Sequence, residues 1–261
     1  MPAAGADGVA ATGGGAGVST VSIVVPTLNE ADRITGCLSR LRSDFPDCEL
    51  VVVDGGSDDG TAALAAALAP VVPSPAGRAV QLNAGAAATR GDVLWFVHAD
   101  TRIDAAALGQ IRAALIDPRV VGGGLSLRFD SRGRALDLLA RASNARARRL
   151  HHVFGDQAMF VRRSGFDALG GFPPWPLMED LELSRRLHRR GRLVLLPATS
   201  TASARRFEEF GTWQMVAFMQ YLKVLYLAGV PPERLADRYR RGPRLPRPRP
   251  HLEVADARPV P

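Results

Sequence analysis

Cysteine and aromatic residues are scarce in this 261-residue sequence. The two cysteines, Cys37 and Cys48, are too few for a disulfide framework and are not spaced as metal ligands. We expect both to behave as small apolar side chains, and a reducing cytoplasm fits their number. Aromatic residues make up 6% of the chain and lie mostly in apolar runs. A nucleic-acid-binding protein would place them beside basic residues, so no nucleic-acid partner is predicted.

Long uninterrupted apolar runs are also missing. The longest apolar stretch, residues 213–230, is broken by Gln214, Gln220 and Lys223, so it does not predict a membrane-spanning helix. A buried helix is the favoured interpretation, and a helix lying on a membrane surface is the alternative. Residues 1–20 lack the basic and apolar regions of a signal peptide. The sequence therefore predicts a cytoplasmic protein, with peripheral contact at the inner face of the membrane left open.

No G-x-G-x-x-G motif follows the first predicted strand, because the glycines at 13–17 precede it, and this disfavours a dinucleotide oxidoreductase. What is present suits one large α/β domain: 46% of residues are hydrophobic and the 23% that are charged are mixed along most of the chain. The formal net charge of +7 favours anionic partners such as nucleotide phosphates, acidic lipids or nucleic acid. A solvated basic surface explains the same charge equally well.

Strand and helix patterns alternate along the middle of the chain. Residues 1–20 are rich in Ala and Gly and predict a flexible leader, and residues 241–261 are rich in Pro and Arg and predict a disordered tail. One domain is expected between them, over residues 21–240. Buried strands are predicted at 21–25, 49–53 and 93–97, and helices at 31–42, 61–69 and 78–89. This order predicts a mostly parallel sheet with helices on both faces, which binds ligands beyond the carboxyl ends of its strands.

Polar clusters follow three of these predicted strands, at 27–30, 54–59 and 98–100. Each cluster has a structural alternative. Thr27 or Asn29 could cap the next helix, and Asp58 and Asp59 are expected to cap the helix after them. Asp54 lies at the strand end itself, where no cap is needed, so its carboxylate is free to accept a hydrogen bond from the imide N–H of a base.

Several motifs together resemble the family 2 glycosyltransferases of the GT-A fold. PTLNE follows the first predicted strand and VVDGGSDDGT spans the end of the second. The remaining motifs are GRAVQLNAGAAATRGD (77–92), FVHAD (96–100), FGDQAMFVRR (154–163), GGFPPWPLMEDLELSRRLHRRG (170–191) and ARRFEEFG (204–211). The His-Ala-Asp and Ala-Arg-Arg-Phe forms are most similar to a bacterial subgroup of such transferases associated with radical-SAM and selenium-domain proteins.

The resemblance implies a donor site for a nucleotide-diphosphate sugar. Pro26, Thr27 and Glu30 match the motif that contacts the nucleoside. Asp54 matches the carboxylate that recognises the base, which is usually uracil and so implies UDP. Arg78 matches a basic residue that reaches the nucleotide.

The resemblance also implies a divalent cation at His98-Ala99-Asp100, where the family usually shows Asp-x-Asp. Asp100 matches the second, metal-binding aspartate, and His98 replaces the first. Mn²⁺ and Mg²⁺ both bind carboxylate and phosphate oxygens, but imidazole suits Mn²⁺ better. His98 could instead contact the ribose or a phosphate, or serve the structure alone.

Glu179 and Asp180 open a predicted helix, so a favourable contact with its dipole is the simpler explanation. In the family this pair is catalytic, and Asp180 matches the general base that takes a proton from the acceptor hydroxyl. Direct displacement by that hydroxyl inverts the anomeric carbon.

Two further segments are candidates for the substrate or acceptor pocket. Gly155, Asp156 and Gln157 precede a strand predicted at 158–162, although a plain turn is an equal alternative. Arg205 and Arg206 follow the last strand and could bind a diphosphate as a bidentate fork, or form a solvated pair. The basic run at 141–149 could face an anionic acceptor or a lipid, but a solvated helix face is favoured.

These features predict a metal-dependent transferase with an unidentified acceptor. The rival enzyme is a nucleotidyltransferase acting on a sugar phosphate, and the rival without catalysis is a nucleotide-binding protein. The transferase prediction requires Asp54, Asp100 and Asp180 to surround one phosphorylated ligand.

Overall fold

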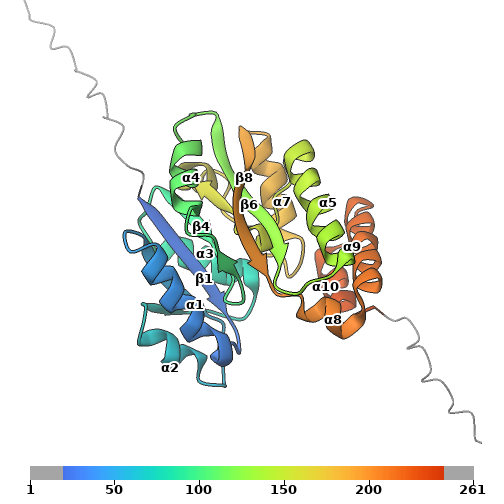
Figure 1. Ribbon diagram of the computed structural model, residues 1–261, viewed down its shortest axis with the longest axis horizontal. Helices are drawn as coiled ribbons and strands as arrows, with labels where there is room; N and C mark the ends of the chain where they lie inside the picture. Colours follow the sequence, from blue (N-terminus) through green and yellow to red (C-terminus); the bar gives the residue numbers. More distant parts are fainter. Residues whose placement is uncertain (1–19, 244–261) are drawn as a thin grey trace, which may run out of the picture.

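The computed structural model describes residues 20–243, and within them strands and helices alternate as the sequence predicts (Figure 1). The predicted leader up to residue 19 and the predicted tail beyond residue 243 lie outside the described residues. The strands are β1 (Val21–Thr27), β2 (Glu49–Asp54), β3 (Val71–Pro73), β4 (Val93–Phe96), β5 (Arg102–Ile103), β6 (Val120–Phe129), β7 (Phe160–Arg162) and β8 (Arg192–Ala202). The helices are α1 (Ala31–Asp44), α2 (Thr61–Ala66), α3 (Arg78–Ala88), α4 (Ala107–Ala114), α5 (Arg134–Leu150), η1 (Gly155–Gln157, a 3₁₀ turn), α6 (Arg163–Asp167), α7 (Glu179–His188), α8 (Arg205–Phe210), α9 (Thr212–Leu227) and α10 (Pro232–Arg241).

The strands form one sheet in the order β3-β2-β1-β4-β7-β6-β8-β5. Strands β1 to β4 pair in parallel, as do β6 and β8, whereas β7 and β5 run antiparallel to their neighbours. The predicted mostly parallel sheet is confirmed. The strand predicted at 158–162 is shorter than expected, because Ala158 has a left-handed φ of +45° at the end of η1 and β7 begins only at Phe160.

Helices cover both faces of the sheet. Alternate residues of a strand point to opposite faces. Ile23 and Val25 of β1 therefore pack with α1, α2 and α4, whereas Val24 packs with α3, α6 and α7. Trp95 of β4 belongs to the first core and Leu94 to the second. These two apolar cores hold the parallel strands rigidly, so the loops at their carboxyl ends start from fixed positions.

A third group of helices, α8, α9 and α10, lies at one end of the molecule beside the carboxyl end of β8 (Figure 1). The interpretation of residues 213–230 as a buried helix is wrong. Within α9, Met215 and Leu222 are buried, but Trp213 and Val224 are each 63% exposed and Leu227 is 68% exposed. The helix packs along one side against α5, α8 and α10 and leaves an apolar face in solvent. No described helix has both the length and the apolar character needed to cross a membrane.

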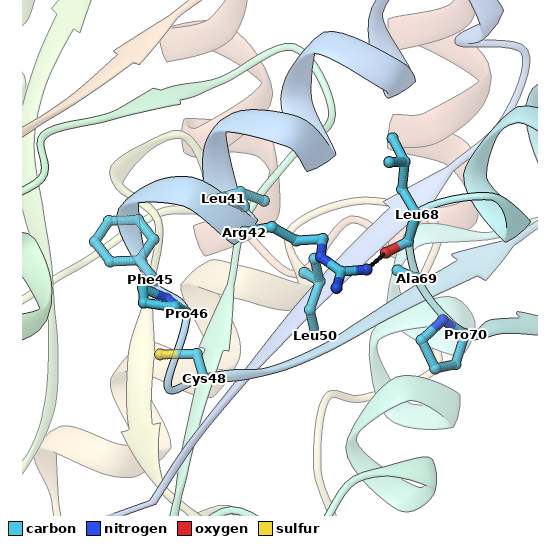
Figure 2. Close-up of a pocket in the computed structure, with 9 residues that line it drawn as sticks. All are labelled: Leu41, Arg42, Phe45, Pro46, Cys48, Leu50, Leu68, Ala69 and Pro70. Carbon is cyan, nitrogen blue, oxygen red and sulfur yellow. Dashed lines mark hydrogen bonds between the residues drawn. The ribbon is translucent and has the colours of Figure 1, made fainter.

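A pocket lies near the amino ends of β2 and β3, at the edge of the sheet opposite the polar clusters (Figure 2). Its lining is largely apolar, and the Arg42 guanidinium donates a hydrogen bond to the carbonyl oxygen of Leu68. Burial raises the pKa of the Cys48 thiol beside it to about 11. Both cysteines are free thiols, and Cys37 is buried in the first core. The expectation of small apolar cysteines is confirmed for Cys37, and this pocket offers no reactive thiolate at neutral pH.

Candidate active site

The polar loops after β1 and β2 bind each other. The Asn29 N–H donates to Ser57 Oγ at 2.9 Å, and the Asp58 N–H donates to Asn29 Oδ1 at 3.0 Å. Asn29 has a φ of +54°, a left-handed conformation that asparagine tolerates better than most residues. The first N–H of α1, from Ala31, donates to Asp59 Oδ2 at 3.0 Å. Helix α1 is therefore capped from the neighbouring loop, not by Asn29 or Thr27 as the sequence suggested.

Asp59 also serves the helix that the sequence assigned to it. Its Oδ1 accepts the N–H of Thr61, the first residue of α2, at 2.9 Å. Asp58 makes its bond through the backbone alone in this network. One carboxylate thus fixes the starts of two helices, and both loops are held at the edge of the sheet.

Asp54 lies at the end of β2 with its carboxylate already engaged. Oδ2 accepts the N–H groups of Gly56 and Ser57 at 3.0 and 2.9 Å, and Oδ1 accepts the hydroxyls of Ser57 and Thr27 at 2.5 and 3.3 Å. Although burial opposes ionisation, the bonds from Ser57, Gly56 and Thr27 hold the pKa of the Asp54 carboxyl below its usual value. The carboxylate is ionised and rigid before any ligand arrives.

Gln81 of α3 ties the same strands to the next helix, and the sequence analysis missed it. Its side-chain amide donates to the carbonyl oxygens of Thr27 and Val53 at 2.8 and 2.9 Å, and the whole residue is buried. Gln81 lies one turn after Arg78, the first residue of α3. Anchoring this turn at the strand ends fixes where the Arg78 side chain begins. A lone glutamine among apolar helical positions was the available signal.

Arg78 joins the strand edge to the start of α7. Its Nε donates to Glu179 Oε1, and its Nη2 lies 3.8 Å from Asp180 Oδ2. The Glu179 side chain is 1% exposed, and its Oε2 has no hydrogen-bond partner among the described residues. Burial raises the pKa of the Glu179 carboxyl, although Arg78 acts in the opposite direction. Glu179 therefore holds the guanidinium, while Asp180 keeps its carboxylate toward the open cleft.

Asp180 is also held by the 3₁₀ turn. Its Oδ2 accepts the N–H of Gly155 at 2.9 Å. A Cβ atom at Gly155 would lie 3.1 Å from the His98 imidazole and 3.5 Å from Asp180 Oδ2. Glycine at this position thus lets the turn, the imidazole and the carboxylate approach closely. Burial, reinforced by the positive charge of Arg78, lowers the pKa of His98 to about 4. The imidazole is neutral at pH 7 and its lone pair can bind a cation or accept a hydrogen bond.

A cleft of about 690 Å³ opens at this edge of the sheet. The predicted site residues that line it are Glu30, Arg78, His98, Asp100, Asp156, Asp180, Arg205 and Arg206. Those that do not line it are Pro26, Thr27, Asp54, Gly155, Gln157 and Glu179. The cleft therefore brings Asp100 and Asp180 together, whereas Asp54 lies outside its lining at the neighbouring end of β2.

The supporting residues around the 3₁₀ turn explain part of this division. Gln157 is fully buried, and its Oε1 accepts the N–H of Phe154 at 3.2 Å, so its side chain holds the turn and does not face the cleft. The Asp156 carbonyl oxygen accepts the Ser200 hydroxyl at 2.8 Å, which leaves the Asp156 side chain directed to the cleft.

Arg205 and Arg206 begin α8, directly after β8. The Arg206 guanidinium lies 4.1 Å from the ring centroid of Tyr239 in α10. Neither arginine forms an ion pair with an acidic side chain in the described part of the chain. Both cations are thus available to an anion in the cleft.

The family model described as glycosyl transferase family 2 matches residues 22–169. The chain belongs to this family. The matched segment carries the strand-end clusters, Arg78, His98 and Asp100, whereas Glu179 and Asp180 come after it. The match is to the family as a whole, so the radical-SAM-associated subgroup stays a prediction.

Solved structures share the fold of this glycosyltransferase. The mannosyltransferase PcManGT from Pyrobaculum calidifontis, solved with GDP-Man and Mn²⁺, superposes with a TM-score of 0.60 and 20% identity, over 84% of this chain and 67% of that chain. Glucosyl-3-phosphoglycerate synthase from Mycobacterium tuberculosis, solved with Mn²⁺, UDP and glucosyl-3-phosphoglycerate, gives a TM-score of 0.59 and 22% identity, over 82% and 81%. The GT-A type fold implied by the sequence motifs is confirmed.

A curated relative is the beta-monoglucosyldiacylglycerol synthase of Synechocystis. It is 25% identical over 213 residues, which cover 74% of this chain and 40% of that protein. The chain therefore spans less than half the length of this relative.

Proposed function

We propose that this glycosyltransferase moves a hexosyl group from a nucleotide-diphosphate donor to an acceptor hydroxyl, with inversion and with a divalent cation. The observation that carries the proposal is the cleft itself. It joins a neutral imidazole and a carboxylate, His98 and Asp100, to a second carboxylate, Asp180, held by Arg78 and by a backbone N–H. This arrangement suits transfer of a sugar from a diphosphate. The departing diphosphate needs positive charge, and the attacking hydroxyl of the acceptor needs a base.

The nucleoside end of the donor would rest on the loops after β1 and β2. Pro26, Thr27, Glu30 and Asp54 are the proposed contacts there, and Asp54 would accept the imide N–H of uracil in addition to the four hydrogen bonds that already fix its carboxylate. Structural neighbours are solved with UDP, with UDP-GlcNAc and with GDP-Man, which supports a nucleotide-diphosphate sugar in general. UDP remains our choice because of the Asp54 match.

The residues present fit a divalent cation held jointly with the donor. Residues 20–243 contain no group of three His, Cys, Asp or Glu side chains that would hold a metal alone. Mg²⁺ sites commonly use one or two carboxylates plus substrate phosphates, so Asp100 with His98 would suffice. Mn²⁺ is favoured by the imidazole, and two structural neighbours are solved with it. The cation would neutralise charge on the departing nucleoside diphosphate.

Asp180 is the proposed general base. Its carboxylate takes the proton of the acceptor hydroxyl as that oxygen bonds to the anomeric carbon. The bond from the anomeric carbon to the phosphate oxygen breaks, and its electrons leave with the diphosphate. Glu179 keeps Arg78 in place. Asp156, with Arg205 and Arg206, would contact the sugar, the diphosphate or the acceptor.

The exposed face of α9 supports the peripheral membrane contact that the sequence left open. Trp213, Val224 and Leu227 expose apolar surface there, and the neighbouring α10 carries Arg238 and Arg241 beside a shared groove. An apolar face flanked by arginines complements an anionic lipid surface. Cosedimentation with vesicles of phosphatidylglycerol should fall for the double variant Trp213→Ser, Leu227→Ser. Equal binding of that variant and the wild type would contradict membrane contact.

A thermal-shift screen of nucleotide-diphosphate sugars with and without Mn²⁺ tests the donor, because a ligand of the native state raises the melting temperature. The expected result is a metal-dependent shift with UDP-sugars. Product analysis then separates the rivals. A nucleotidyltransferase would release pyrophosphate from a sugar 1-phosphate and a nucleoside triphosphate. A protein that binds the donor but never releases a nucleoside diphosphate, with any acceptor, would be a nucleotide-binding protein only.

A further inference from the structure

A smaller recess opens off the main cleft between α5, η1 and α9. Its volume is about 90 Å³, many times the space that one water molecule needs. The recess is continuous with the cleft, because both are lined by Phe129, Phe154, Asp156, Phe207, Met219 and Lys223. Arg146 from α5 is among the residues that line the recess but not the cleft. We call Arg146, Phe154, Asp156 and Lys223 the cationic recess.

Two cations face the same aromatic ring in the cationic recess. The Arg146 guanidinium lies 3.8 Å from the ring centroid of Phe154, and the Lys223 ammonium lies 4.7 Å from it. The Nε and Nη2 atoms of Arg146 are shielded from solvent and have no hydrogen-bond partner in residues 20–243. Neither cation comes within 4.0 Å of a carboxylate oxygen in that range. Arg146 lines the recess with donors that have no acceptor in the protein, and a ligand in the recess could supply one.

The charges in the recess do not balance. One carboxyl, Asp156, stands against two cations, and its shielded Oδ1 also has no partner among the described residues. Burial raises the pKa of the Asp156 carboxyl, although Arg146 acts in the opposite direction. An unpaired charge away from water is unfavourable unless a counter-ion or hydrogen bond offsets it. An oxyanion in the recess, which both cations line, would offset this charge.

The recess adjoins the turn that holds the proposed base. Asp156 follows Gly155, whose N–H binds Asp180 at 2.9 Å, so the recess and the base share one turn. The donor phosphates have other candidates, namely the cation that Asp100 would hold and the arginines Arg205 and Arg206, which form no ion pair in residues 20–243. A group in the recess is therefore placed to anchor the molecule whose hydroxyl Asp180 deprotonates.

We infer that the cationic recess binds a phosphate monoester or carboxylate carried by the acceptor, so that a nearby hydroxyl of the same molecule reaches Asp180. The inference rests on the proposed function, because it takes Asp180 as the base and an acceptor as the second substrate. The oxyanion could belong to a small metabolite or to the headgroup of a lipid, since both present the same chemistry to Arg146 and Lys223.

Calorimetric titration of the full chain saturated with UDP and Mn²⁺ tests the inference. Glycerol 3-phosphate, glycerate and glycerol share hydroxyls and differ in charge. We expect at least one of the two anions to bind and glycerol not to bind. Arg146→Gln and Lys223→Gln should each weaken anion binding about tenfold, as expected for loss of a charge-assisted contact. Arg149→Gln, an exposed arginine on the same helix, should match the wild type.

Vesicles separate the two sources of the anion. Binding to phosphatidic acid but not to phosphatidylcholine, lost in Lys223→Gln, would identify a lipid phosphate. Should Arg146→Gln fail to fold, Arg146→Lys and Lys223→Gln carry the test, with the lysine variant expected to retain part of the affinity.

The inference is overturned if no anion binds in either form, if glycerol binds as well as the anions, or if both recess variants bind them normally. Competition between the anion and UDP would also overturn it, because the recess would then belong to the donor. Failure of UDP itself to bind, with or without Mn²⁺, is a separate outcome that defeats the proposed function.

Discussion

The loops proposed to hold the donor and the recess proposed to hold the acceptor treat their polar groups differently. On the donor side, Asp54 accepts four hydrogen bonds from its own loop and from β1, and Gln81 is bonded to two strands. On the acceptor side, shielded atoms of Arg146 and Asp156 have no partner in residues 20–243. The donor loops are complete without a ligand, and the acceptor side is not.

This difference separates two ways in which a binding site can be prepared. A saturated network fixes geometry in advance and adds stability, because every buried polar group has a partner. Unpartnered charges lower stability and are retained where a ligand or a reaction needs them. We therefore expect substitutions on the donor side to affect folding and substitutions on the acceptor side to affect transfer.

The largest effect is expected for Asp180→Asn. The amide keeps the shape of the side chain but cannot take the proton of the acceptor, so the transfer rate should fall about 10²- to 10⁴-fold. UDP-sugar affinity should stay close to that of the wild type, since Asp180 acts on the acceptor. Single-turnover release of UDP measures the rate, and a thermal shift with UDP and Mn²⁺ measures donor binding.

Asp167→Asn, at an exposed aspartate on α6, is the matched control and should leave both values unchanged. Normal turnover by Asp180→Asn would remove Asp180 from the role of base. A loss of donor binding as large as the loss of rate would place this carboxylate on the donor side of the comparison.

A smaller loss is expected for Asp100→Ala, which removes the carboxylate proposed to hold the cation. Changes around metal ligands commonly cost about 10- to 100-fold in metal affinity or activity, so UDP affinity in Mn²⁺ should fall by at least about tenfold. In EDTA the two proteins should bind UDP equally weakly. Titration of UDP with and without Mn²⁺ distinguishes these values, and an unchanged affinity in Mn²⁺ would contradict the metal assignment.

A pair of aspartate variants compares the two sides directly through stability. Asp54→Ala leaves the Gly56 and Ser57 N–H groups without their acceptor and should lower the free energy of unfolding by about 1–3 kcal/mol. Asp156→Asn copies the neutral form that burial favours, so it should raise that free energy by about 1 kcal/mol. Urea unfolding at pH 7 measures both.

The pH dependence of the Asp54 effect provides its control. Hydrogen bonds lower the pKa of Asp54 in the folded state, so its contribution is present above the unfolded pKa and is lost as pH falls through the folded value. The difference between Asp54→Ala and the wild type should therefore shrink below about pH 4.

Destabilisation by Asp156→Asn at pH 7 would show that the acceptor side is a structural network after all.

The donor side was largely predictable from the sequence, for a physical reason. Short β-branched runs that stop at Pro26 and Asp54 predict parallel strands, and parallel strands bring their ends to one edge. The same logic placed His98 and Asp100 at that edge. Sequence reasoning missed the bond between Arg78 and Glu179, because the partners are 101 residues apart and no local pattern links them.

The acceptor side was poorly predicted because its helices carry conflicting patterns. The run at 141–149 suggested a solvated face, yet Arg146 turns inward beside the buried small residues Ser143 and Ala147. Lys223 was treated as an interruption of an apolar stretch, although it lies next to buried Leu222 and points into the recess. A charge next to a buried helical position was the signal in both cases, but its meaning depended on which helices pack there.

The smallest expected effect is the pH dependence of oxyanion binding through Lys223, which is specific to the acceptor side. Burial lowers the pKa of Lys223 to about 8, with Arg146 of α5 adding to that shift and Asp156 of η1 and Asp180 of α7 opposing it. Because the folded pKa is below the usual value, the ammonium that an anion needs is present below about pH 8 and disappears above it. Oxyanion affinity should therefore fall about fivefold between pH 7.5 and 9.5. Lys223→Arg keeps its charge over this range and should show no such fall. A pH profile shared by both proteins would trace the titration to another group. Lys223 would then no longer distinguish the acceptor side from the donor side.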